Sequence, residues 1–178
     1  YEISLCGAHQ VDNAMTALGV LSALLDGHCL PASAIQKGLE QAQWPGRLEW
    51  LGNVLIDGAH NPQGAQTVCD YVQHFLKDRR IVLLTGMMAD KDVRSYADRI
   101  APLADEIHCV APEHIPRAMP ANELAALYRE RTEKPVFEWE ETEQALSAAQ
   151  KSVGDQGVVL ICGSLYLAGE IRRLLIAE

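Results

Sequence analysis

The chain has 178 residues, 48% of them hydrophobic, which is enough to bury one sizeable core. Its formal net charge is −9 with the acidic residues spread along the sequence, and this excludes nucleic acid as an expected partner because phosphate backbones select basic surfaces. No apolar run is long enough to cross a bilayer and no signal peptide is visible, so we expect no membrane partner either.

Residues 1–43 form a region with its own pattern. Residues 1–5 are typical of a strand entered midway, which suggests a piece of a longer protein. Residues 9–42 carry no strand signal, and Gly27 and Pro31 separate two expected helices as C-cap and start signal. Apolar residues at helical spacing form the expected inward face of the first helix: Val11, Met15, Leu18, Leu21 and Leu25. In the second helix we expect Ile35 and Leu39 to point inward.

The segment 44–47, Trp-Pro-Gly-Arg, is a turn-forming break and a candidate linker. From residue 48 onward, strand and helix patterns alternate. The expected strands are 48–51, 54–56, 81–85, 106–110, 136–139 and 158–162, and the expected helices are 62–77, 93–101, 121–131, 142–152 and 165–176. In the first of these helices we expect Ala65, Val68, Val72 and Phe75 to form the apolar face.

Near-continuous apolar strands such as 81–84 indicate burial on both faces. Together with the alternation, this predicts an α/β fold with a mostly parallel six-stranded sheet and helices on both faces. Only Gly52 and Asn53 separate the first two strands, so we expect those two to be antiparallel neighbours. The predicted organisation is a helical segment over 1–43 and an α/β domain over 44–178.

The segment 57–62, Asp-Gly-Ala-His-Asn-Pro, lies between the strand 54–56 and the next helix. Asn61 is a good N-cap and Pro62 suits the first helical position. Asp57 and His60 then lie at the carboxyl end of a strand beside the positive end of a helix, where open α/β sheets hold anionic ligands. The alternative is a capped turn in which Asp57 accepts backbone N–H groups and His60 points at solvent.

Three other side chains have a functional and a structural interpretation. Arg47 can pair a phosphate bidentately, or it is a solvated residue of an interdomain turn. Asn13, on the same helical face as His9, can read a base edge through one donor and one acceptor, or it belongs to a solvated face. Ser164 opens the last helix, where an N-cap is the default interpretation; it is not in a G-x-S-x-G elbow, so a hydrolase nucleophile is excluded.

The remaining polar residues and motifs do not indicate a dinucleotide site, a disulfide framework or a metal site. Lys91 and Asp92, in the turn 86–92, are interpreted as solvated. The sequence has no P-loop and no G-x-G-x-x-G motif, so the sheet is not a standard dinucleotide binder. The five cysteines are odd in number and lack C-x-x-C spacing, and the six histidines lack metal-ligand spacing. We therefore expect a cytoplasmic protein whose chain provides no metal ligands.

The motifs in their order resemble the folylpolyglutamate synthase/dihydrofolate synthase family of the Mur ligase superfamily. They are Pro-Gly-Arg at 45–47, Asp-Gly-Ala-His-Asn-Pro at 57–62, Gly86 with Asp-Lys-Asp at 90–92, and Cys-Gly-Ser-Leu-Tyr at 162–166. The resemblance covers the whole chain but only the C-terminal part of the family's length. It implies a Rossmann-like C-terminal domain, preceded at 1–43 by the end of the central ATP-binding domain.

The resemblance implies an ATP- and Mg²⁺-dependent ligase that phosphorylates a folate or dihydropteroate carboxylate, after which the amine of L-glutamate attacks the acyl phosphate. By motif matching, Asn13, Arg47 and Asp57 correspond to positions that contact ATP, and His60 and Ser164 to positions linked to glutamate binding and the chemical step. The P-loop and the magnesium ligands would lie outside this chain, which we expect to be monomeric and inactive by itself.

Two alternatives remain open at this point. The first is the C-terminal domain of a Mur peptide ligase, whose acceptor would be a UDP-linked precursor. The second is a non-catalytic α/β module that binds a nucleotide or an amino acid.

Overall fold

The computed structural model describes residues 1–26 and 30–177 of the chain. Within them the elements are, in order, α1 (His9–Leu24), α2 (Ala32–Glu40), β1 (Glu49–Leu51), β2 (Val54–Ile56), α3 (Pro62–Phe75), β3 (Ile81–Thr85), α4 (Val93–Ile100), the 3₁₀ turn η1 (Ala101–Leu103), β4 (Glu106–Val110), α5 (Ala121–Arg129), β5 (Val136–Trp139), α6 (Thr142–Val153), β6 (Val158–Cys162) and α7 (Leu165–Ile176). The predicted alternation of strands and helices after residue 48 is confirmed.

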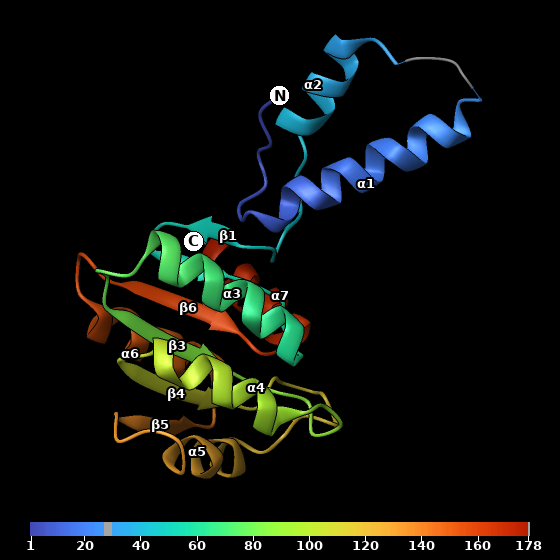
Figure 1. The fold of residues 1–178 in the computed structure, drawn as a ribbon. Helices are drawn as coiled ribbons and strands as arrows, with labels where there is room; N and C mark the ends of the chain where they lie inside the picture. The colour runs from blue at the N-terminus through green and yellow to red at the C-terminus, as the bar shows by residue number, and fades with distance from the viewer. Residues whose placement is uncertain (27–29, 178) are drawn as a thin grey trace.

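The six strands form one sheet in the order β1-β2-β6-β3-β4-β5 (Figure 1). β1 pairs with β2 in antiparallel fashion, as the two-residue connection predicts, and the other neighbours are parallel. The central strands β3 and β6 are buried along their whole length, which matches their continuous apolar sequence. The predicted α/β class with a mostly parallel sheet is therefore confirmed.

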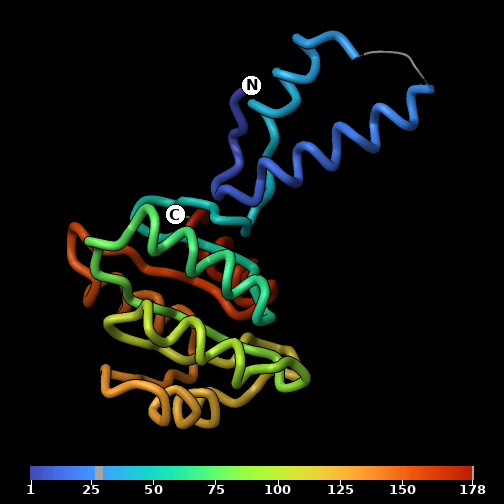
Figure 2. Tube along the Cα trace, in the orientation of Figure 1, coloured from blue at the N-terminus to red at the C-terminus, as the bar shows by residue number. Residues whose placement is uncertain are grey.

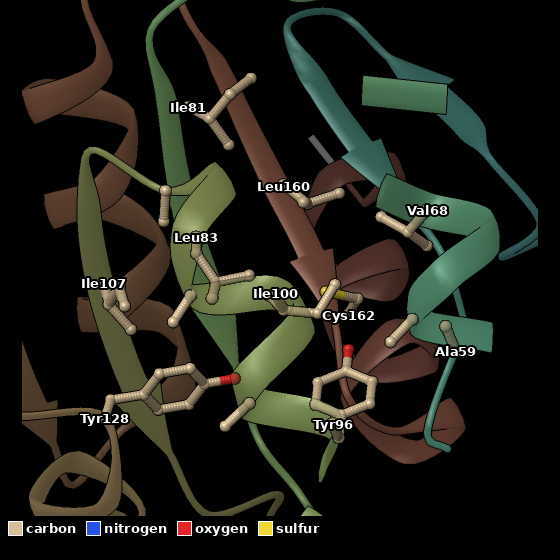
Figure 3. Packing of buried hydrophobic residues seen from close by; sticks show 14 of the residues in the cluster. Ala59, Val68, Ile81, Leu83, Tyr96, Ile100, Ile107, Tyr128, Leu160 and Cys162 are labelled. Atoms are coloured by element: carbon tan, nitrogen blue, oxygen red, sulfur yellow. The ribbon is translucent and has the colours of Figure 1, made fainter. Parts of the chain in front are cut away.

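Helices cover both faces of the sheet. Figure 1 shows α3 and α4 in front of it and α6 and α7 behind it. Alternate residues of each strand contribute to the two cores: Leu83 and Leu160 pack with α3, α4 and α5, whereas Val82 and Ile161 pack with α6 and α7. In the first core, the fully buried rings of Tyr96 and Tyr128 fill the space beneath the helices (Figure 3).

This topology brings four connections to one edge. Because β2, β3, β4 and β6 are parallel, their carboxyl ends lie at the same edge of the sheet, and the segments 57–61, 86–92, 111–120 and 163–164 follow them. Backbone hydrogen bonds link these segments: Gly163 N donates to Ala59 O (2.8 Å), and Met119 N donates to Met87 O (2.8 Å). Gly163 is required at its position, because its φ is +113° and a Cβ there would lie 2.7 Å from Thr85 Oγ1.

The N-terminal region differs from expectation in two respects. Residues 1–5 contain no strand, and the two helices α1 and α2 extend away from the sheet (Figure 2). The expected inward face of α1 is wrong for three of its five residues: Val11, Met15 and Leu21 are exposed, whereas Leu18 and Leu25 are half-buried. The buried residue of α1 is instead a polar one, Gln10. The predicted cap at Gly27 lies outside the described residues.

The prediction that Phe75 lies on the buried face of α3 is also wrong. Ala65, Val68 and Val72 are buried as expected, but Phe75 is 59% exposed at the last position of the helix. Its ring packs against Tyr71 and His74 instead of the sheet. Leu76, just beyond the helix, fills the core position.

A buried polar chain crosses β4 and β5. Trp139 Nε1 donates to His108 Nδ1 (2.9 Å), so His108 carries its hydrogen on Nε2 and donates it to Glu106 Oε1 (2.8 Å). Arg80 and Ser152 donate to the other Glu106 oxygen. Burial lowers the pKa of His108, although the Glu106 carboxylate opposes the shift.

We expect this chain to make stability depend on pH. The folded state holds His108 neutral, so the unfolded chain binds protons more readily once the pH falls below about 6.5. Protonation must also break the bond from Trp139, so the unfolding free energy should fall by about 1 kcal/mol between pH 7 and pH 5. When the unfolding free energy from urea titrations is plotted against pH over this range, His108→Gln should give a shallower slope than the wild type. The exposed control His74→Gln should keep the wild-type slope, and equal slopes in all three proteins would contradict the assignment.

In the part of the chain that the structure describes, no helix is both long and apolar enough to span a bilayer.

Candidate functional site

A cavity of about 500 Å³ lies at the carboxyl edge of the sheet, where α1, the 44–47 turn and the start of α3 meet. Four of the five predicted site residues line it, namely Asn13, Arg47, Asp57 and His60. They come from three separate stretches of the chain. The fifth, Ser164, lines a smaller neighbouring cavity.

Asp57 holds the turn that forms the cavity floor. Its carboxylate accepts from Leu48 N (3.0 Å, Oδ2) and from Ala59 N (2.8 Å, Oδ1). Burial raises the pKa of Asp57, while these two N–H donors and Arg47 oppose the shift. The capped-turn alternative for Asp57 is thus confirmed as a structural role, and the side chain still lines the cavity.

The turn that carries Arg47 is held in an unusual backbone conformation. Gly46 and Leu48 have φ of +73° and +46°. Leu48 is fully buried, and the left-handed region is a strained conformation for its bulky side chain. Hydrogen bonds stabilise the turn, including one across it from Arg47 N to Trp44 O (3.2 Å). Leu48 N donates to Asp57, Gly46 N donates to Glu49 Oε2 (2.8 Å), and Gly58 N donates to Gly46 O (2.7 Å).

Glu49 is itself held by Arg172 of α7, whose Nε lies 2.9 and 3.0 Å from the two carboxylate oxygens. The Arg47 side chain is exposed and extends from the 44–47 turn, with its guanidinium 5.6 Å from the ring centroid of Trp44. The charge lies over an exposed ring at the cavity wall, where an anion can reach it.

The start of α1 adds a chain of polar side chains. Asn13 Nδ2 donates to Gln10 Oε1 (2.9 Å), and Gln10 Nε2 lies 2.9 Å from His9 Nε2, to which it donates. Gln10 is buried and Asn13 is exposed, so the first fixes the amide of the second. Asn13 therefore presents its oxygen and its second N–H to the cavity. Burial lowers the pKa of His9, and Arg47 adds to the effect.

His60 is not simply directed at solvent. It is half-buried, and its Nδ1 lies 2.9 Å from Gly58 O. Because a carbonyl oxygen only accepts, Nδ1 carries the hydrogen, and in the neutral ring Nε2 then has the lone pair. The next two residues behave as predicted: Asn61 caps α3 by accepting from Gly64 N (2.8 Å), and Pro62 occupies the first helical position.

The smaller cavity, of about 90 Å³, is lined by His60, Met88, Lys91, Arg117, Ser164, Leu165 and Tyr166. Arg117 lies 3.1 Å from Asp90 and contacts the Tyr166 hydroxyl (3.4 Å), and its backbone carbonyl accepts from Ala89 N. With Lys91, it gives this cavity two cations. We define this group as the cationic pocket.

Ser164 acts as the N-cap of α7, accepting from Tyr166 N (3.0 Å), so the default interpretation of this residue is confirmed. Its side chain is almost fully buried, but its hydroxyl hydrogen remains available to a ligand in the cationic pocket. Asp92 caps α4 in the same way, through Ser95 N.

The sequence did not single out Arg117. It lies in the irregular segment after β4, fifty-seven positions beyond His60, and nothing in its local pattern signals a site. Lys91, which was interpreted as solvated, is in fact half-buried and lines the pocket. Among residues 1–26 and 30–177, no group of three or more His, Cys, Asp or Glu side chains is placed to hold a metal ion.

Comparisons with known proteins show which family the chain resembles. The family model described as "Mur ligase, glutamate ligase domain" matches residues 46–165. The folylpolyglutamate synthase of Lacticaseibacillus casei is 33% identical over 98% of the chain, and the dihydrofolate synthase/folylpolyglutamate synthase of Bacillus subtilis is 32% identical over 97%. The chain spans 40% of the length of each of these relatives.

Solved structures show the same likeness. A Mycobacterium tuberculosis folylpolyglutamate synthase, complexed with ADP and AMPPCP, superposes with a TM-score of 0.91 at 30% identity over 97% of this chain and 41% of that one. Escherichia coli FolC in complex with DHPP and ADP superposes with a TM-score of 0.84 at 27% identity, over 93% of this chain and 39% of that one.

Proposed function

This chain belongs to the Mur ligase family, as its glutamate ligase domain, and on that premise we propose that the complete protein is an ATP-dependent ligase that joins L-glutamate to a folate or dihydropteroate. The observation that carries the proposal is the meeting of Asn13, Arg47, Asp57 and His60 around one cavity, next to a second, cationic one. The first suits a nucleotide and the second suits an amino-acid carboxylate.

In this proposal the larger cavity receives ATP. The oxygen and free N–H of Asn13 match the donor and acceptor on an adenine edge, and Gln10 holds that amide in place. Arg47 faces the phosphates and offsets charge on the transferring phosphoryl group. Asp57 accepts from ribose hydroxyls or orders a magnesium-bound water. We assign the metal's ligands to the rest of the protein; within the described residues no group of three or more His, Cys, Asp or Glu side chains is placed to hold an ion.

We assign the glutamate to the cationic pocket. Arg117 and Lys91 suit its carboxylates, because a guanidinium binds a carboxylate in a fork and an ammonium adds a point charge. Ser164 donates its free hydroxyl hydrogen, and the start of α7 adds backbone N–H groups. The nucleotide and the amino acid would then meet at His60, whose ring lines both cavities.

The test is ADP release by the complete protein. We expect turnover that requires ATP, L-glutamate and a dihydropteroate or folate together. Turnover with a UDP-linked precursor instead would favour the Mur peptide ligase. No turnover with either acceptor, together with tight binding of a nucleotide or amino acid by the chain alone, would favour the non-catalytic module. The buried free thiols of this chain support a reducing, cytoplasmic location for the protein. We also propose that the protein is a monomer.

Arg117→Ala should raise the KM for glutamate about 10- to 100-fold with little change in kcat, because the charge-assisted guanidinium fork to the substrate carboxylate is lost. Arg129→Ala is the matched control. Each arginine is 50% exposed and forms a single ion pair of nearly equal length, 3.1 Å to Asp90 and 3.2 Å to Glu138. Steady-state kinetics with varied glutamate measure the effect. Equal KM values for the two variants would remove Arg117 from the site.

A further inference from the structure

His60 occupies the boundary between the two cavities. Among the described residues, only His60 and Leu165 line both the 500 Å³ cavity and the cationic pocket, and His60 is the titratable one of the two. A group that passes from one cavity to the other along this shared wall lies close to the imidazole. In the proposed reaction, the amine of the amino acid must make that crossing to reach the activated carboxyl group.

The backbone determines the chemical form of the ring. Gly58 O accepts from Nδ1 at 2.9 Å, so the neutral ring has its lone pair on Nε2. A neutral imidazole in this tautomer cannot donate from Nε2 to a carboxylate. It can accept a proton there, and the resulting imidazolium would keep its Nδ1–H bond to the carbonyl oxygen of Gly58.

The carboxylates of the substrate have other partners. Lys91 and Arg117 line the cationic pocket, and Ser164 adds a hydroxyl donor. With the negative groups held there, the positively charged ammonium is left to face His60. The charged or titratable groups that line the two cavities with His60 are His9, Arg47, Asp57, Lys91, Arg117 and Tyr166.

We propose that His60 Nε2 is the base that takes a proton from the ammonium group of the incoming amino acid, and does not bind its carboxylate. This deepens the proposed function and rests on it. The proton moves from nitrogen to Nε2, and the freed lone pair attacks the carbonyl carbon of the acyl phosphate. A C–N bond forms, the C–O bond to phosphate breaks, and the phosphate leaves with that electron pair. The second proton leaves the amide nitrogen with the departing phosphate.

The test compares two nucleophiles in the complete protein. Glutamate arrives as an ammonium ion and needs a base, whereas hydroxylamine is already neutral near pH 8 and does not. In His60→Asn, the side-chain amide can still donate to Gly58 O, but Nε2 is gone. We expect kcat with saturating glutamate to fall about 100-fold or more, and kcat with hydroxylamine to stay within about threefold of wild type.

The outcomes separate the explanations. A rise in the KM for glutamate with unchanged kcat would overturn the proposal in favour of carboxylate binding. An equal loss with both nucleophiles would also overturn it, because the defect would then precede amine attack. His74→Gln, an exposed histidine of α3 outside both cavities, should behave as wild type with each nucleophile. A wild-type protein that releases no ADP with any pterin acceptor would refute the proposed function itself.

Discussion

Arg47→Ala should lower kcat/KM of the complete ligase for ATP by about 10²- to 10³-fold. The guanidinium faces the cavity from a turn fixed by Asp57 and Glu49, so its position is preorganised for the charge that develops on the transferring phosphoryl group. Arg47→Lys should recover only part of the loss, because an ammonium cannot form the bidentate fork. Steady-state ADP release with varied ATP measures both variants.

Arg94→Ala is the control for Arg47. It removes another exposed arginine, on α4, which lines neither cavity and whose ion pair to Glu130 is long at 3.8 Å. It should leave kcat/KM unchanged. If Arg47→Ala retained activity within about twofold of wild type, the cavity would not be the phosphate site. Because Arg47 contacts only the exposed Trp44 ring in the described contacts, its loss should not change the unfolding free energy by more than about 0.5 kcal/mol.

Asp57→Ala should have the largest effect on stability of the site substitutions. It leaves the N–H groups of Leu48 and Ala59 without an acceptor in a buried turn, and each such group costs about 1–3 kcal/mol. Part of this is offset, since a buried carboxylate is lost as well. We expect the unfolding free energy to fall by about 2–3 kcal/mol in urea titrations of this chain, and the complete protein to lose its ligase activity.

Two further variants make the Asp57 result specific. Asp57→Asn keeps one acceptor oxygen but directs an NH₂ group at the second donor, so it should lie between wild type and Asp57→Ala. Asp70→Ala removes an exposed carboxylate from α3 that bonds only Gln66 among the described side-chain contacts, and its effect should stay within about 0.5 kcal/mol. A similarly small effect for Asp57→Ala would mean that the turn does not depend on the carboxylate.

The strands and helices of the α/β region were predictable because their signals are local. The apolar run 81–84 and the period of Ala65, Val68 and Val72 depend only on neighbours within a few positions, and the structure places them as expected. The N-terminal helices show the limit of such signals. Apolar spacing identifies α1 as a helix, but whether Met15 is buried depends on a partner that the described chain does not provide.

The site divides in the same way. By itself, the sequence determined the strand–turn–helix junctions that hold Asp57, His60 and Ser164, because helix capping and turn formation depend on residues adjacent in the chain. Only the tertiary structure decided that Arg117 joins them, through backbone bonds between the 111–120 and 86–92 segments, and that His60 separates two cavities. The physical reason is that a cavity forms between segments far apart in the chain, and parallel strand order, not local residue preference, brings those segments to one edge.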